Sequence, residues 1–179
     1  ALAIDENRKH FPLAGWGYSH DVQKMDGREP PWLRQVWFAG NHSDIGGSHP
    51  EEESRLSDIS LGWMVEQLNE LEYPPMIDES KLRLWPDSKG VQHDERKAML
   101  EAGWQAWLPA RLRVTWPEEA RTIHPEAELH PSVMERLSAN AVANYDAIGE
   151  YRPKVLQEHN EARKFFGGAE STLPEKHGT

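Results

Sequence analysis

Two stretches of apolar residues, each followed by polar and turn-forming residues, predict the first strands of the chain. Residues 35–39, Gln-Val-Trp-Phe-Ala, form a nearly continuous apolar run that Gly40 closes, which is the pattern of a buried central strand. A polar, glycine-rich loop is expected directly after it, over residues 40–47. Residues 1–4 form a shorter apolar run that ends at Asp5, and we expect a weaker strand there.

The periodicity changes to that of a helix after the loop. Ser57 suits an N-cap and Pro74 ends the segment, so a helix is expected over residues 57–72. Its apolar side chains recur at intervals of three or four residues and form one stripe: Leu61, Met64, Val65, Leu68 and Leu71. A strand, a loop and a helix in succession indicate an α/β fold.

Weaker patterns predict the elements of the second half. Residues 82–85 and 112–116 resemble edge strands, and residues 96–108 have helical spacing. Residues 132–135, Ser-Val-Met-Glu, have the spacing of a capping box. Apolar residues then recur at three or four positions, so we expect one helix that begins at this box and ends near Gly149.

The composition excludes several classes of function. The chain has 20 Lys and Arg against 30 Asp and Glu, a formal net charge of −10, which argues against binding to a nucleic-acid backbone. The mean hydropathy of −0.78 and the short apolar runs leave no segment of the roughly 20 residues that a membrane-spanning helix needs. The absence of cysteine excludes disulfides, thiolate metal sites and cysteine nucleophiles. We expect no cofactor.

His42 and Asp5 are candidate catalytic residues because each follows an expected strand. Reacting groups in open α/β sheets gather at the carboxyl ends of strands, and histidine is the commonest acid–base group near neutral pH. In a Ser-His-acid triad the acid orients the imidazole, and the α/β-hydrolase fold presents the acid before the histidine. Asp44 is a further candidate acid, although its closeness to His42 also suits a role in fixing the loop.

Two observations bear on this hypothesis. The sequence contains no G-x-S-x-G motif, so the serine nucleophile of such a hydrolase is expected outside this chain. A metal-dependent hydrolase is the alternative, because His42, Asp44 and His49 offer nitrogen and oxygen ligands within eight residues. Their spacing matches no standard zinc motif such as H-E-x-x-H, and we favour the triad without a metal.

Five stretches carry motifs that occur together in one protein family. Residues 36–47, V-W-F-A-G-N-H-S-D-I-G-G, and residues 56–64, L-S-D-I-S-L-G-W-M, are the most specific. Residues 1–8 fit the pattern A-L-A-L-D-E-x-R, residues 129–137 contain L-H-P-S-V, and residues 151–153 read Y-R-P. In this order and spacing they resemble the uncharacterised α/β-hydrolase domain family that includes the phospholipase effectors of bacterial type VI secretion.

The resemblance implies a serine esterase or phospholipase with a Ser-Asp-His triad that acts on lipid esters. The family's nucleophile motif G-F-S-R-G and a W-D-T-V stretch lie upstream of A-L-A-L-D-E, so the chain is expected to begin after both. His42 matches the family's H-S-D-[IV]-G-G histidine and is the expected base. Asp5 is the best acid inside the chain, and the upstream Asp competes with it. His93-Asp94-Glu95 stands where family members often have H-D-S, and we assign that segment no chemistry.

These expectations combine into one hypothesis with one main alternative. Residues 1–153 are expected to form the carboxyl-terminal half of an α/β-hydrolase catalytic domain, and residues 154–179 a polar, flexible tail. Alone, this half would be inactive for lack of the nucleophile. The alternative is a non-catalytic interaction or regulatory module, with a partner at an unpaired sheet edge. Localisation stays open between the cytoplasm and delivery by a secretion system without a cleavable signal.

Overall fold

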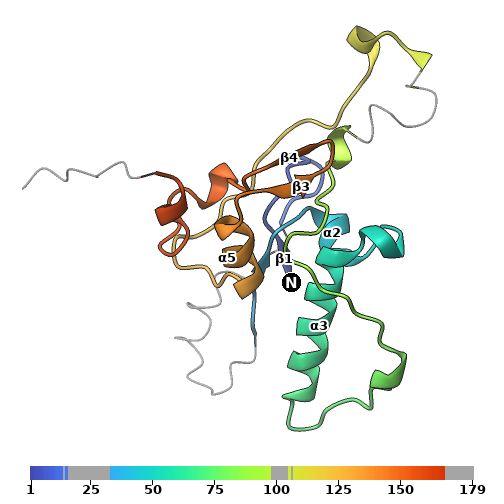
Figure 1. Ribbon diagram of the computed structural model, residues 1–179, viewed down its shortest axis with the longest axis vertical. Coiled ribbons are helices and arrows are strands. Elements are labelled where there is room, and N and C mark those ends of the chain that lie inside the picture. Colours follow the sequence, from blue (N-terminus) through green and yellow to red (C-terminus); the bar gives the residue numbers. More distant parts are fainter. Residues whose placement is uncertain (14, 16–32, 98–104, 106, 168–179) are drawn as a thin grey trace, which may run out of the picture.

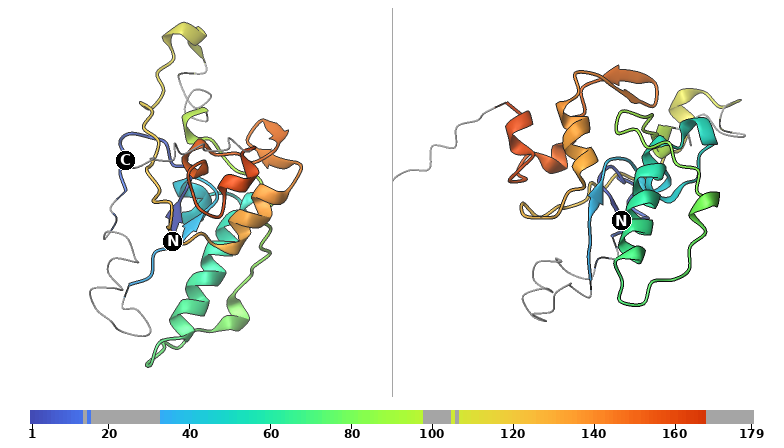
Figure 2. Two further views of the ribbon diagram at one scale, coloured as in Figure 1. Left: turned by 90° about the vertical axis from the view of Figure 1, so that its left-hand side faces the viewer. Right: turned by 60° about the horizontal axis from the view of Figure 1, so that its bottom comes forward.

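Short parallel strands lie at the centre of the molecule, with helices on both sides. The computed structural model describes residues 1–13, 15, 33–97, 105 and 107–167. Helix α5 lies on one side of the strands, and helices α2 and α3 lie on the other (Figures 1 and 2). This arrangement of helices and small sheets is that of an α/β protein, as the sequence predicts.

The expected central strand is confirmed. Strand β1, Leu2–Ala3, pairs in parallel with strand β2, Trp37–Phe38, and the register places Leu2 opposite Trp37. On the other edge of β2, the Trp37 amide donates to the Glu128 carbonyl, and the His130 amide donates to the Trp37 carbonyl. Strand β2 therefore lies between β1 and the parallel segment around Leu129.

The side chains of β2 are buried on both faces of the sheet. Trp37 and Ala39 face the larger core, which they share with Val133 and Leu137 of α5. Val36 and Phe38 face the opposite side and pack against Trp63 of α3. Because neighbouring residues of a strand point to opposite faces, this continuous burial explains why the segment is apolar without alternation.

The expected loop after β2 contains a short helix. Helix α2, His42–Gly46, begins after Asn41, whose side chain accepts hydrogen bonds from the amides of Ser43 and Asp44. The Asp44 carboxylate in turn accepts the Asn41 amide, which completes a capping box. The prediction of a loop was wrong here because this reciprocal cap lets a five-residue helix form within a glycine-rich sequence.

Helix α3 exists as predicted but buries a different face. It covers Arg55–Asn69 and begins two residues before the predicted cap at Ser57. Its buried apolar side chains are Leu56 and Trp63, with Ser60 between them. Three residues of the predicted stripe are instead 47%, 42% and 52% exposed: Leu61, Met64 and Leu71.

The second half differs most from the prediction. Helix α5 covers only Pro131–Ser138, and the expected continuation to Gly149 is replaced by a hairpin of β3, Val142–Asn144, and β4, Ala147–Gly149. Tyr145 has a positive φ of 44° at the turn between these strands. A helix cannot continue through that conformation.

A buried arginine holds this hairpin against the helix. Arg136 of α5 is fully buried, and its guanidinium donates to the carbonyls of Ser88, Gly90 and Ala143 at 2.7, 2.8 and 3.0 Å. Burial lowers the pKa of Arg136, although Tyr151 and nearby carboxylates act in the opposite direction. Because a buried guanidinium without partners would be costly, these carbonyls fix how the three segments pack.

Other elements complete the described chain. The prediction of a strand over residues 112–116 was wrong, because these residues form no strand and residues 110–112 lie in a 3₁₀ helix. Residues 82–85, the other expected edge strand, pair with no other strand of the described chain. Most of the predicted helix over 96–108 lies outside the described residues. No helix in the described part of the chain is long and apolar enough to cross a membrane. The 3₁₀ helices are η1 (Glu51–Glu53), η2 (Glu79–Lys81), η4 (Ala110–Leu112), η5 (Lys154–Leu156) and η6 (Arg163–Phe165).

Packed structure continues past the expected boundary at residue 153. Leu156 and Ala162 are fully buried and belong to the larger core, and Phe165 packs against it. Residues 154–166 are therefore part of the folded unit. Residues 168–179 of the predicted tail lie outside the described residues.

Gly40 permits the close packing between β2 and α2, and its replacement tests that packing. Its φ is +119°, and a Cβ at this position would lie 2.6 Å from the Cβ of Asp44. We expect Gly40→Ala to lower the free energy of unfolding by about 2–4 kcal/mol, measured by urea denaturation. Gly46→Ala is the matched control, because nothing lies within 4 Å of its added Cβ. Equal stability of the two variants would contradict this packing.

Candidate active site

The ends of β1 and β2 bring the predicted catalytic segments to one edge of the sheet. The Ile4 amide donates to the Phe38 carbonyl, and the Asp5 amide donates to the Gly40 carbonyl. Asp5 and Glu6 therefore leave β1 directly beside the segment that carries Asn41 and His42. This is the position where open α/β sheets place their binding and reacting groups.

His42 is exposed at the first position of α2. Its ring contacts Phe11 edge to face, with the ring centroids 5.8 Å apart. Within the described chain, no carboxylate is hydrogen-bonded to the His42 imidazole. An accessible imidazole at a strand end can exchange protons with a bound molecule.

Glu6 holds the backbone of His42 through a hydrogen bond. Its carboxylate accepts the His42 amide at 3.2 Å and binds the Arg8 guanidinium through two contacts of 2.8 and 2.6 Å. Burial alone would raise the pKa of Glu6, but the hydrogen bonds and charge of Arg8 outweigh it and lower the pKa. The Arg8 guanidinium also lies 3.9 Å from the centre of the Phe11 ring. The backbone of His42 is thus held by Glu6, and its ring is held by Phe11, which in turn packs against Arg8.

The Asp5 carboxylate is bonded to Tyr151 and Gly40 and not to the His42 imidazole. Its Oδ2 accepts the Tyr151 hydroxyl at 2.7 Å and the Gly40 amide at 2.8 Å. Burial raises the pKa of Asp5, and these two hydrogen bonds and the charge of Arg136 oppose that rise. The structure therefore joins Asp5 to the base of the loop and to residue 151.

The Asp44 carboxylate binds a different histidine. Only 1% of its side chain is exposed, and Oδ1 lies 2.7 Å from Nδ1 of His93. Oδ2 accepts the amides of Asn41 and His93 at 3.0 and 3.2 Å. Asn41 adds a further link, because its side-chain amide donates to the His93 carbonyl. Asp44 and Asn41 therefore attach α2 to the segment around His93.

His49 completes a group of three potential metal ligands. Its ring stacks on that of His93 with centroids 3.4 Å apart, and its Nε2 lies 3.5 Å from Oδ1 of Asp44. Burial lowers the pKa of His49, and the neighbouring His93 ring lowers it further. Asp44, His49 and His93 offer ligand atoms that all lie within 4.8 Å of one another. Of the metal ligands that the sequence offered as an alternative, Asp44 and His49 thus lie together, and His93 takes the place of His42.

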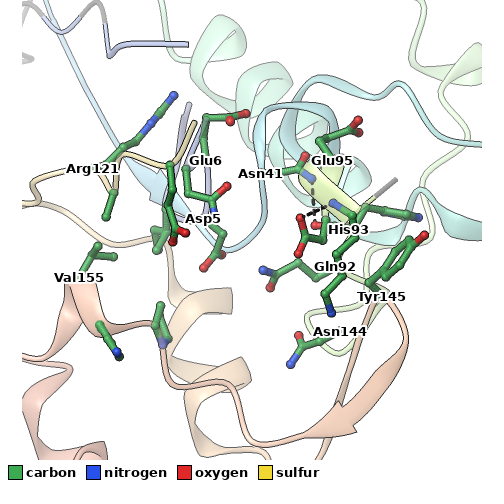
Figure 3. Close-up of a pocket in the computed structure, with 18 residues that line it drawn as sticks. Asp5, Glu6, Asn41, Gln92, His93, Glu95, Arg121, Asn144, Tyr145 and Val155 are labelled. Carbon is green, nitrogen blue, oxygen red and sulfur yellow. Dashed lines mark hydrogen bonds between the residues drawn. The ribbon is translucent and has the colours of Figure 1, made fainter. Parts of the chain in front are cut away.

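A polar cavity of about 380 Å³ lies between these groups and the hairpin. Asp5, Glu6 and Arg121 line one side, and His93 and Tyr145 line the other (Figure 3). The lining contains side chains of both charges. Such a cavity offers a ligand charged and hydrogen-bonding groups beside apolar surface.

The comparison with known families bears on the same segments. Residues 1–67, which contain β1, β2, α2 and most of α3, match a family model described as T6SS phospholipase effector Tle1-like, catalytic domain. This part of the chain is related to the Tle1-like phospholipase effectors. The strand ends that carry Asp5 and His42 thus lie within the match. Searches among curated proteins and among solved structures each found no match.

The sequence placed Asp5 and His42 after two strands, whose ends lie side by side in the structure, but it missed several contacts between these ends and other segments. His93, Glu6 and Tyr151 had no assigned role, yet each binds a residue of the strand ends. The available signal was that Glu6 and Tyr151 lie in stretches that resemble the family and that His93 stands where family members often have H-D-S. No local sequence pattern predicts these pairs, because His93 lies 49 residues from Asp44 and Tyr151 lies 146 residues from Asp5.

The raised pKa of Asp5 predicts a pH-dependent stability. A carboxyl whose pKa is higher in the folded state stabilises the fold at low pH and loses that contribution as the pH rises through the folded pKa. Asp5→Asn keeps a neutral acceptor for Tyr151 and Gly40. We therefore expect the stability of the wild type relative to this variant, measured by urea denaturation between pH 4 and 8, to fall as the pH rises above the ordinary pKa of an aspartate and to level off above the folded pKa. A difference that is constant over this range would contradict the assignment.

Proposed function

We propose that this chain supplies the histidine-bearing part of the active site of a serine phospholipase or related lipid esterase. The observation that carries the proposal is the exposed His42 at the carboxyl end of the central strand β2, inside the segment that matches the Tle1-like catalytic domain. The fold around it would be the corresponding part of an α/β-hydrolase domain. The serine nucleophile would come from a segment outside these 179 residues, since the sequence has no G-x-S-x-G.

In this proposal His42 acts as general base and then as general acid. Its imidazole removes the proton from the serine hydroxyl while the serine oxygen attacks the ester carbonyl carbon. The tetrahedral intermediate then expels the alcohol, and the imidazolium returns a proton to the leaving alkoxide. Water repeats the two steps to release the fatty acid and the free serine. An imidazole on an exposed helix start has the access that these transfers require.

Asp5 and Asp44 would act as positioning residues in this arrangement. Asp5 holds Gly40 at the start of the loop, and Asp44 holds the first turn of α2 against residue 93. The amide of His42 is held separately by Glu6. The carboxylate that orients the imidazole would then come from outside this chain, as the resemblance to the family allows.

A cleft near His42 suits the phosphate of a phospholipid. It has a volume of about 230 Å³, and its lining includes Phe11, the ring that contacts His42, the cationic side chains of Lys9 and Arg121, and Arg8, whose guanidinium is already paired with Glu6. The full lining is Arg8, Lys9, Phe11, Pro12, Leu13, Glu119, Ala120, Arg121 and Thr122. Cationic side chains beside an apolar surface complement a lipid with an anionic headgroup. This lining supports a phospholipid over an uncharged ester.

A non-catalytic interaction module is the second candidate, and two surface features favour it. Leu61 and Met64 are exposed on α3, and Leu71 is exposed just after its end. On the free edge of β1, no strand pairs among the described residues, and the Ala3 carbonyl there accepts a hydrogen bond from Arg121. An open edge and an apolar helix face are both surfaces to which another protein segment can bind.

The decisive variant for the catalytic proposal is His42→Ala. In a polypeptide that joins this chain to its serine-bearing segment, we expect kcat for phospholipid hydrolysis to fall by about 1,000-fold or more. His124→Ala is the matched control, because this histidine precedes the segment at Leu129 that pairs in parallel with Trp37, whereas His42 follows β2. Asp5→Asn is expected to lose far less activity than His42→Ala. A loss below tenfold for His42→Ala would remove it from the mechanism.

A fluorophosphonate probe separates the candidate functions. We expect no labelling of the 179-residue chain alone and labelling of the serine-bearing polypeptide that disappears when its serine is replaced. Labelling of the chain alone would contradict an external nucleophile. Hydrolysis that the probe does not inhibit but a chelator abolishes would favour a metal-dependent enzyme. A polypeptide that is neither labelled nor active would favour the interaction module.

A further inference from the structure

Asp44, His49 and His93 form a compact group with no assigned role in the proposed catalysis. They come from three separate places: α2, the residues that follow it, and the segment before residue 95. All three side chains are largely shielded, with 1%, 16% and 12% of their surfaces exposed. The fold thus gathers two imidazoles and one carboxylate at a single point.

One nitrogen of this group has no hydrogen-bond partner. Nε2 of His49 is buried and forms no hydrogen bond within the described chain. It lies 3.5 Å from Oδ1 of Asp44 and 3.9 Å from Oε1 of Glu95, too far for a direct hydrogen bond with either oxygen. A cation held between this buried nitrogen and the two carboxylate oxygens would give all three atoms a partner.

The second histidine, His93, has the outer hydrogen bond that a metal ligand needs. Its Nδ1 is hydrogen-bonded to Oδ1 of Asp44 at 2.7 Å, a contact that an ion shared by the two atoms would replace, while its Nε2 lies 3.1 Å from Oε2 of Glu53. If Nδ1 holds a metal, Nε2 keeps its proton and donates it to Glu53. Metal-binding histidines almost always donate their other N–H to a carboxylate or carbonyl in this way.

We propose that Asp44, His49 and His93 bind a divalent transition-metal ion, with Zn²⁺ as the best match. Two imidazole nitrogens and a carboxylate are a ligand set that Zn²⁺ favours, and it needs one more ligand for a tetrahedron. Glu95, whose Oε1 lies 3.9 Å from Nε2 of His49, is the nearest further carboxylate. The three ligand atoms lie within 4.8 Å of one another, and the stacked rings of His49 and His93 would have to tilt so that both nitrogens face the ion.

The ion would act as a structural clamp beside the proposed active site. It would join α2 to residues 93–95, and Asp44 lies two residues from His42 on that helix. Metal binding to the folded state alone raises stability by mass action. This inference does not depend on the proposed hydrolase activity, because binding and unfolding are measured directly.

The test is a titration of chelator-treated, dialysed protein with Zn²⁺ by calorimetry and with Co²⁺ by visible absorption. We expect one equivalent to bind, with a Kd in the micromolar range or tighter, the absorption of four-coordinate Co²⁺, and a rise in Tm. Absence of binding below millimolar Zn²⁺ would overturn the proposal. So would Co²⁺ that binds with the spectrum of the hydrated ion.

Variants locate the ion. His49→Gln and His93→Gln keep the size of the side chain, and each is expected to weaken Zn²⁺ binding by at least 100-fold, whereas Glu53→Gln should weaken it by about tenfold. His10→Ala is the control, since this exposed histidine lies outside the group. Tm values in chelator show whether each variant folds without metal. Unchanged binding in His93→Gln, or a loss caused by His42→Ala instead, would contradict this set of ligands.

Discussion

The Asp44 carboxylate is the contact on which the arrangement of the strand ends depends. It is buried, and its two oxygens accept the amides of Asn41 and His93 and face the His93 ring. A buried carboxylate that lost these partners would cost several kcal/mol, so the helix start and the segment at residue 93 must stay together. Gly40 makes the contact possible, because any side chain there would collide with Asp44. The position of His42 follows from this geometry and from the bond between its amide and Glu6.

Burial of β2 on both faces gives this edge its rigidity. Trp37 packs toward α5 and Phe38 packs toward α3, so the strand cannot slide without moving both cores. The residues that follow β2 are thereby held in a fixed position along the strand direction relative to the residues that follow β1. A proton-transferring group needs this kind of support, because small displacements of a reacting group are costly to catalysis.

The motifs that resemble the phospholipase family prove to be partners of one another in space. Asp5, from the first stretch, accepts a hydrogen bond from Tyr151 in the last. The sequence predicted β2 because a continuous apolar run has few alternatives to a buried strand. It failed at residues 139–149, where Arg136 and the turn at Tyr145 favour a hairpin over the continued helix. It also failed to pair His93 with Asp44, because such a contact leaves no trace in local spacing.

If His42 is the general base, its ring must face the reacting ester. The most direct test is a crystal structure of the serine-bearing polypeptide after reaction with a fluorophosphonate, which leaves a tetrahedral adduct on the nucleophile. The account predicts a ring nitrogen of His42 within hydrogen-bonding distance of the adduct, about 2.6–3.2 Å. An adduct whose nearest imidazole belongs to another histidine, with His42 in solvent, would contradict it.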